Sequence, residues 1–349
     1  MRPERVVPGR PLQEGLDGAV LTRDLAVGGE RWSKGRRLSA ADLARLVVTG
    51  DPASGPLTVL VLEPGDVHED EAAVALAEAA AGAGLTVRGP AQSRVDLVAD
   101  HDGVLHVRVS ELERVDTVDP LEIFTAFDGS IVAAGAIVAS VKIAPHVVDE
   151  AILRPVLDRL RGLNDGLVRV DPFLPMRVTV VVKESIRASG RERFEQSVRD
   201  KVETLGSTVT EFAYVEDDDG DVIRAMTRAA SGRSRADVVL TAGGRSTDPL
   251  DPFFVAIAHL GGAVVRRGVP AHPGSMLWLA RIGRTAILGL PTCGAYSKAT
   301  AADLVLPRLL TGERPGRKLA AGLGHGGLLT RDQRFRFPSY ARDLDAPTG

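Results

Sequence analysis

The sequence predicts an α/β protein in which the C-terminal domain is a doubly wound, mostly parallel sheet and the preceding N-terminal region is β-rich and mixed. Between residues 170 and 313, β-branched runs alternate with stretches that carry apolar residues at helical spacing. This alternation is typical of β-α-β units in a sheet covered by helices on both faces. Residues 93–148 instead hold short alternating stretches separated by Asp, Gly and Pro, which indicate strands that mostly lack intervening helices.

The C-terminal elements are expected in regular succession. Arg177–Lys183 is a β-branched run and predicts the first strand. Phe194, Val198 and Val202 fall on one helical stripe, and Gly206 follows as a C-cap glycine. Further strands are predicted at 208–215, 236–241, 263–266 and 285–288, and further helices at 221–230, 252–260 and 296–310. In the N-terminal region one helix is predicted, at 69–81.

The composition fits a soluble protein. At 349 residues with 44% hydrophobic content, the chain is long enough for two or three domains with real cores. The net charge of −3 gives no sign of a nucleic-acid or anionic-membrane partner. The single cysteine, Cys293, excludes an intramolecular disulfide and fits a reducing compartment. Residues 1–14 lack an apolar stretch, and the longest apolar run, 131–141, is shorter than the roughly 20 residues of a membrane span. We therefore expect a cytoplasmic protein.

Four segments are expected along the chain. Pro172 and Pro175 flank the boundary between the β-rich region and the C-terminal domain. The expected segments are an N-terminal segment 1–55, a β-rich mixed region 56–170, a ligand-binding domain 171–313 and a tail 314–349.

The most informative motif follows the strand predicted at 236–241. The polar loop after this strand reads Gly243, Gly244, Arg245, Ser246 and Thr247. Two glycines let backbone amides approach a ligand, hydroxyls add donors, and an arginine can pair with a phosphate. A loop of this kind before a helix predicts an anion site, although a plain strand-to-helix turn would have the same pattern.

Acidic residues accompany this loop. Asp248 and Asp251 could hold Mg²⁺ together with phosphates of a ligand, because Mg²⁺ commonly binds through one or two carboxylates. Asp217 and Asp218 follow the neighbouring strand and could complete a polar or metal site. The alternative is that these residues are helix caps, Asp251 for the helix that starts near Pro252.

Two further loops could line the same crevice. Cys293 lies where a helix is expected to begin, but no partner histidine is near in sequence, so we expect it to contact a ligand or pack rather than act as a nucleophile. The residues of these loops are Pro273, Gly274 and Ser275 in the first, and Pro291, Thr292, Cys293 and Gly294 in the second.

Taken in order, these motifs resemble a known family. The Gly-Gly, Ser and Asp pattern of 236–251, the acidic loop 217–219, and the Pro-Gly and Leu-Pro loops resemble the molybdopterin-binding domain of the molybdenum-insertion enzymes of molybdenum cofactor biosynthesis. Residues 18–25 and 34–43 are similar to the N-terminal segment of the same proteins.

The resemblance implies a function and a set of ligands. It implies that the chain binds molybdopterin or its adenylated form and acts as a molybdopterin molybdenumtransferase, with molybdate as a substrate and Mg²⁺ as a helper. It also favours a homodimer, and a molybdoenzyme would be the partner if the chain delivers the cofactor. By position, Gly243, Gly244 and Ser246 would hold the phosphate, Asp251 would be the catalytic loop aspartate, and Asp217 or Asp218 would be the second acid.

Departures from the family pattern keep other functions open. The loop at 243–248 has Arg245, Thr247 and Asp248 where the family usually reads Val, Val and Gly. The Leu-Pro loop continues Thr-Cys-Gly where the family reads Gly-Asn-Pro. The chain could therefore be a non-catalytic module that binds or delivers molybdopterin, and a weaker alternative is a nucleotide-pyrophosphatase-like enzyme on the same fold.

Overall fold

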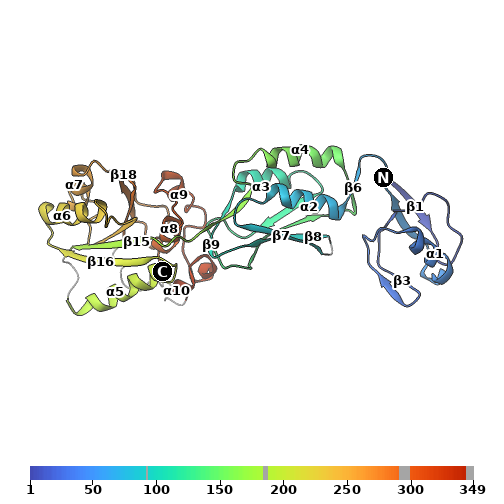
Figure 1. Cartoon of the computed structure of the whole chain (residues 1–349), viewed down its shortest axis with the longest axis horizontal. Coiled ribbons are helices and arrows are strands. Elements are labelled where there is room, and N and C mark those ends of the chain that lie inside the picture. Colours follow the sequence, from blue (N-terminus) through green and yellow to red (C-terminus); the bar gives the residue numbers. More distant parts are fainter. Residues whose placement is uncertain (92, 184–187, 291–298, 343–349) are drawn as a thin grey trace. The chain divides into compact units, whose positions relative to one another are not determined.

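The computed structural model divides into two compact units, and it describes residues 1–91, 93–183, 188–290 and 299–342 (Figure 1). The first unit comprises Met1–His101, Leu105–Asp128 and Ala134–Val170. The second comprises Asp102–Val104, Gly129–Ala133 and the chain from Asp171 onward. In the described ranges, no helix combines the length and the apolar character that crossing a bilayer requires.

The start of the first unit is a small β structure around a buried tryptophan. One sheet has the order β1-β5-β2, and β3 pairs with β4 in a hairpin. Trp32 is fully buried among apolar side chains from these strands and from α1, including Leu46 and Val59. The elements are β1 (Arg2–Val6), β2 (Val20–Leu21), β3 (Leu25–Val27), β4 (Glu30–Trp32), α1 (Ala40–Thr49), the 3₁₀ turn η1 (Pro52–Ser54) and β5 (Leu57–Val61).

The rest of the first unit is an antiparallel sheet of order β10-β12-β8-β7, with α2 packed against it. Helix α4 packs on α2 in turn, and a two-stranded sheet joins β6 to β13. The elements between residues 66 and 172, of which β11, the start of β9 and the end of β14 fall in the second unit, are β6 (Asp66–His68), α2 (Glu69–Ala80), β7 (Leu85–Ala91), β8 (Arg94–Ala99), β9 (Gly103–Val107), α3 (Val109–Asp116), β10 (Leu121–Thr125), β11 (Ile131–Val132), β12 (Ile137–Ile143), β13 (Val147–Asp149), α4 (Glu150–Arg161) and β14 (Val168–Pro172).

The second unit is built on a six-stranded sheet of order β16-β15-β17-β20-β19-β18. The first four strands run parallel, and β19 is antiparallel to both of its neighbours. The elements are β15 (Arg177–Lys183), α5 (Ala188–Glu203), β16 (Thr208–Val215), α6 (Asp219–Ala230), β17 (Val238–Ala242), α7 (Pro252–His259), β18 (Ala263–Arg267), β19 (Trp278–Ile282), β20 (Thr285–Gly289), α8 (Ala302–Leu309), α9 (Arg317–Ala321), the 3₁₀ segment η3 (Arg331–Arg336) and α10 (Ser339–Arg342).

Helices cover both faces of this sheet. Phe194 of α5 and Val305 of α8 belong to one buried cluster, and Met226 of α6 and Phe253 of α7 belong to the other. Figure 1 shows α5 on one side of β15 and β16, and α6 and α7 on the opposite side. The predicted class, an α/β protein with a mostly parallel, doubly wound C-terminal sheet and a strand-rich N-terminal region, is confirmed. The four predicted segments stay a prediction.

Several elements differ from the sequence prediction, among them α1 and α3, which were not predicted. Three further differences have an identifiable reason. Helix α4 was not predicted; it contains Pro155, a residue that usually ends a helix. Strand β19 forms a hairpin with β20 through the two residues 283 and 284, so the sheet has an antiparallel edge that a β-α-β reading omits. Helix α8 begins at Ala302, so residues 299–301, which were predicted to be helical, are not; Thr300 N–H donates to Asp303 Oδ2 at 2.9 Å at the start of the helix, and residues 296–298 of the predicted helix lie outside the described residues.

The packing at the end of β20 gives a first prediction. A Cβ added at Gly289 would overlap the indole ring of Trp278 on the neighbouring strand, which is almost fully buried. Gly289→Ala should therefore lower the free energy of unfolding of the second unit by about 1–3 kcal/mol, the usual cost of overpacking. Differential scanning calorimetry of the full chain checks it. The control is Gly316→Ala, where the added Cβ has room, and a Gly289→Ala protein as stable as this control would contradict the prediction.

Candidate functional site

The candidate site lies where the winding of the sheet reverses. After β15 the chain moves outward to β16, and it then returns across β15 to form β17 on the other side. Ligands of open α/β sheets bind outside the carboxyl ends of the strands at such a reversal, because the two connecting loops separate and leave a crevice. Lys183 ends β15, Asp217 follows β16, and the loop 243–251 follows β17.

Lys183 joins these strand ends. Its Nζ lies 2.8 Å from Asp217 Oδ1 and 2.6 Å from Asp251 Oδ2, and its side chain is only 1% exposed. Asp251 is equally buried, whereas Asp217 is 42% exposed. A buried ammonium is costly unless it is paired and hydrogen-bonded, and here two carboxylates from two different loops pair with it.

Asp251 fixes the shape of the loop 243–251. Its Oδ1 accepts from Phe253 N–H at 3.0 Å, which caps α7, and its Oδ2 accepts from Arg245 N–H at 2.7 Å. The alternative reading of Asp251 as the cap of this helix is therefore what the structure shows, and the same carboxylate also holds the loop and Lys183. Hydrogen bonds to a carboxylate are stronger than neutral ones, so the loop is held rigidly.

Arg245 covers Lys183, Asp217 and Asp251 from the solvent side, and these four residues form the Lys183 cluster. Its guanidinium lies 2.9 Å from Asp217 Oδ2, and its side chain is 56% exposed. The hydrogen bond from Lys183 holds the pKa of the Asp217 carboxyl below its ordinary value, and the charges of Lys183 and Arg245 act in the same direction against burial. Two cations and two carboxylates thus pair in this cluster, and a third carboxylate, that of Asp248, lies 3.6 Å from Arg245 Nε at its edge.

The backbone of the loop presents donors to solvent. Gly243 has φ +84°, a conformation that side chains with a Cβ rarely adopt. A Cβ added at Gly244 would lie 3.1 Å from the ring of Phe253, so bulk at this position would strain the fold as well as any ligand contact. Among the described residues, no acceptor receives the N–H of Ser246 or Thr247. These two amides remain available to an anion.

The other predicted acids have structural partners. Asp218 caps α6 by accepting from Asp221 N–H at 3.0 Å. Asp248 accepts from Leu250 N–H at 2.9 Å. The described part of the chain contains no group of three or more His, Cys, Asp or Glu side chains that could hold a metal ion. Since both oxygens of Asp251 already accept hydrogen bonds, these contacts do not favour the predicted Mg²⁺ role of Asp248 and Asp251.

The turn at 273–275 lies at the same edge of the sheet as the Lys183 cluster. Strand β18 runs parallel to β20, because both are antiparallel to β19. The connection from β18 to β19 therefore leaves from the carboxyl edge. Pro273 O accepts from Ala301 N–H at 2.9 Å, and Gly274 has φ +102°. Ser275 belongs to this turn, and its carbonyl accepts from Val269 N–H at 2.9 Å.

A buried pair supports the start of α8 near this turn. Lys201 of α5 pairs with Asp303, and both side chains are almost fully buried. Burial raises the pKa of the neighbouring Tyr340 well above its ordinary value, and the negative charge of Asp303 adds to the effect. The predicted ligand residues Pro291, Thr292, Cys293 and Gly294 lie outside the residues that the structure describes.

Sequence reasoning did not select Lys183 as a site residue. A signal was available: a lysine directly follows a run of valines in a strand whose two faces are both covered by helices. A charged side chain at the end of such a strand is either buried with partners or directed into the crevice beyond the strand ends. The acids at 217 and 251 were the partners to look for.

Residues 178–311 match the model of a protein family described as a probable molybdopterin binding domain. The resemblance predicted from the loops is thereby confirmed for the second unit, and the Lys183 cluster and the loop 243–251 lie inside the matched range.

Solved structures that match the chain are distant in sequence. The molybdopterin biosynthesis enzyme MoaB of Thermus thermophilus is 21% identical over 40% of this chain and 98% of that one, with a TM-score of 0.29. The molybdopterin biosynthesis MoeA protein of Pyrococcus horikoshii is 13% identical over 71% of this chain and 74% of that one, with a TM-score of 0.31. CinA of Thermoplasma acidophilum, a protein with unknown function, is 14% identical over 35% and 90%, with a TM-score of 0.28. None of the curated proteins compared with the chain matches it.

The buried pairing of Lys183 gives a second prediction. Lys183→Met should lower the free energy of unfolding of the second unit by about 3–5 kcal/mol, because it leaves the buried carboxylate of Asp251 without its cation. Urea unfolding followed by the fluorescence of Trp278 measures this, in a Trp32→Phe background that removes the signal of the first unit. The control Lys318→Met removes an exposed lysine from α9 and should change stability by less than about 0.5 kcal/mol. Equal stability of the two variants would show that Lys183 does not hold the strand ends together.

Proposed function

We propose that the second unit binds molybdopterin or its adenylated form across the carboxyl ends of β15, β17 and β20, in a role in molybdenum cofactor biosynthesis. The loop 243–251 carries this proposal. Asp251 holds it in one shape, and the amides of Ser246 and Thr247 are available to an anion. The loop lies at the reversal of the sheet, inside a range matched to a probable molybdopterin binding domain.

The phosphate of the pterin is assigned to this loop. Ser246 and Thr247 supply N–H and hydroxyl donors, and Arg245 supplies a guanidinium that suits phosphate geometry. The ion pair of Arg245 with Asp217 joins two half-exposed groups, so releasing the arginine to a ligand costs little. The turn 273–275 lines the same crevice in this proposal, and the family resemblance assigns residues 291–294, which lie outside the described residues, to the same ligand.

A molybdenumtransferase is the more specific proposal. Molybdate and the sulfur ligands of the pterin both carry negative charge, so bringing them together requires nearby cations. Lys183 and Arg245 supply such charge. Asp217 is the partly exposed acid of the cluster, and in this scheme it accepts or donates a proton. Asp251, enclosed by three donors, positions Lys183 and the loop in this scheme. A homodimer, a cytoplasmic location and a molybdoenzyme partner are further expectations.

The internal pairing of the acids favours a second candidate, a non-catalytic module that binds or delivers molybdopterin. Both carboxylates of the cluster, Asp217 and Asp251, are already engaged with Lys183 and with the loop. Measurement of turnover distinguishes the two candidate functions. Product formation from adenylated molybdopterin and molybdate supports the transferase, and tight binding without product supports the module.

Binding at the loop gives a third prediction. Ser246→Glu places a negative charge and extra bulk where the phosphate is assigned, so the affinity for molybdopterin should fall at least about tenfold. The pterin retained by the purified protein is quantified by its fluorescence after oxidation. The control Ser231→Glu makes the same change at the end of α6, whose chain direction places it at the opposite edge of the sheet. If both variants retain as much pterin as the wild type, the phosphate does not bind at this loop.

Chemistry at the cluster gives a fourth prediction. Asp217→Asn removes the charge that pairs with Lys183 and Arg245, and it should lower molybdenum insertion per folded molecule about tenfold or more while pterin binding is kept. That separation marks an interaction made mainly in the transition state. The control Asp219→Asn changes an exposed acid two residues further on and should leave insertion unchanged. Wild-type insertion by the Asp217→Asn protein would exclude a catalytic role for this carboxylate.

A further inference from the structure

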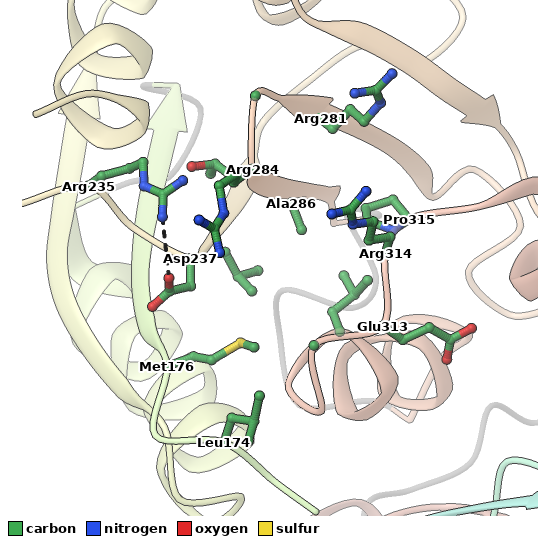
Figure 2. Close-up of a pocket in the computed structure, with 15 residues that line it drawn as sticks. Leu174, Met176, Arg235, Asp237, Arg281, Arg284, Ala286, Glu313, Arg314 and Pro315 are labelled. Carbon is green, nitrogen blue, oxygen red and sulfur yellow. Dashed lines mark ion pairs between the residues drawn. The ribbon is translucent and has the colours of Figure 1, made fainter. Parts of the chain in front are cut away.

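A cavity of about 630 Å³ opens at the edge of the six-stranded sheet opposite to the Lys183 cluster (Figure 2). It is lined by the amino ends of β17 and β20, by Met176 just before β15, and by residues 312–315 beyond α8. Strand β15 is seven residues long, so the two edges are roughly 20 Å apart at about 3.3 Å per residue. The cavity is therefore a separate site from the proposed pterin crevice.

The interior of the cavity is apolar. Its floor and walls are formed by aliphatic side chains from β17, β20, α8 and the segment before β15. Figure 2 shows Leu174 and Met176 side by side on the wall, across from the segment that carries Arg314 and Pro315. The apolar lining residues are Leu174, Met176, Val238, Ala286, Leu309 and Pro315. A cavity of this volume and lining suits a small molecule that carries an apolar ring.

The rim of the cavity is cationic. Four arginines line it, Arg235, Arg281, Arg284 and Arg314, against the two carboxylates of Asp237 and Glu313. Both carboxylates have cations or donors of their own. Glu313 pairs with Arg308 at 2.7 Å, and Figure 2 shows its side chain directed away from the cavity. Asp237 accepts from Arg177 N–H at 3.0 Å and lies 4.0 Å from Arg235.

Three of the four rim arginines, Arg281, Arg284 and Arg314, pair with no carboxylate among the described residues. Figure 2 shows the guanidinium groups of Arg284 and Arg314 approaching the cavity from opposite sides, one from the β19–β20 hairpin and one from the segment after α8. Two planar forks that converge on one space match the geometry of a phosphate or carboxylate.

We propose that this cavity is a second ligand site, which binds a small molecule composed of an apolar ring and a phosphate or carboxylate group. The ring lies against Met176 and Leu174, and the anionic group lies between Arg284 and Arg314. The proposal does not depend on molybdopterin binding, because no residue of the Lys183 cluster or of the loop 243–251 lines the cavity.

The test uses phenyl phosphate as a probe and the methyl groups of methionine as reporters. The chain has four methionines, so methyl-labelled full-length protein gives a simple spectrum. Met176 lines the cavity, whereas Met226 is buried in α6 on a face of the sheet and serves as the internal reference. The Met176 signal, assigned with a Met176→Leu variant, should shift saturably with phenyl phosphate while the Met226 signal stays in place. Phenol and inorganic phosphate alone should each bind more weakly than phenyl phosphate.

Variants locate the anionic group. Arg284→Ala/Arg314→Ala should raise the dissociation constant of phenyl phosphate at least about tenfold and leave pterin retention unchanged. The matched control Arg331→Ala/Arg334→Ala removes two exposed arginines of η3 and should change the dissociation constant less than about twofold. The proposal is overturned by an absent or non-saturable Met176 shift, by an equal shift of Met226, or by equal weakening in both double variants.

Discussion

One buried ammonium determines the arrangement of the candidate site. Lys183 ends the central strand β15, and its ammonium pairs with the carboxylates of Asp217 and Asp251, which follow β16 and β17. The ends of β15 and β17 therefore cannot separate without cost, since separating them would take Lys183 away from the buried carboxylate of Asp251. Asp251 extends this constraint through its bonds to Arg245 N–H and Phe253 N–H. The loop that offers free amides to solvent is thus held from beneath by the same carboxylate that neutralises the lysine.

The pairing of charges in the cluster indicates how it would respond to an anion. Buried Lys183 and Asp251 are fixed, whereas Arg245 and Asp217 are half-exposed and paired at the surface. An arriving phosphate competes with Asp217 for Arg245, and a surface ion pair offers little resistance to that exchange. Asp217 then retains Lys183 as its cation. The inner ion pair of the cluster therefore stays rigid when a ligand binds, and the outer ion pair can be exchanged for the ligand.

Much of this arrangement was readable from the sequence, and the part that was not depends on contacts between distant residues. The β-branched run of 178–182, the apolar stripe of α5 and the caps at Asp218 and Asp251 are local signals. The alternation of such strand and helix signals predicted the sheet. The pairing of Lys183 joins residues 34 and 68 positions apart, so no local pattern reveals it. Strand β19 was missed because its partner is a hairpin neighbour rather than a β-α-β neighbour. Helix α4 was missed because it contains Pro155, a residue that usually ends a helix. In the structure, tertiary packing overrides this preference.

The opposite edge of the sheet raises the question of why arginines gather there. Helices that connect parallel strands end at this edge, and cations near helix ends compensate the partial negative charge of the last carbonyls. That explanation fits Arg177, whose guanidinium approaches Ser234 O at 3.4 Å in the connection between α6 and β17. It does not fit Arg284 or Arg314. The first lies at the tip of the β19–β20 hairpin, where no helix ends, and the second lies five residues beyond the end of α8. Both side chains instead approach an apolar cavity (Figure 2). We therefore attribute their charges to binding of a ligand in the cavity rather than to compensation of helix ends.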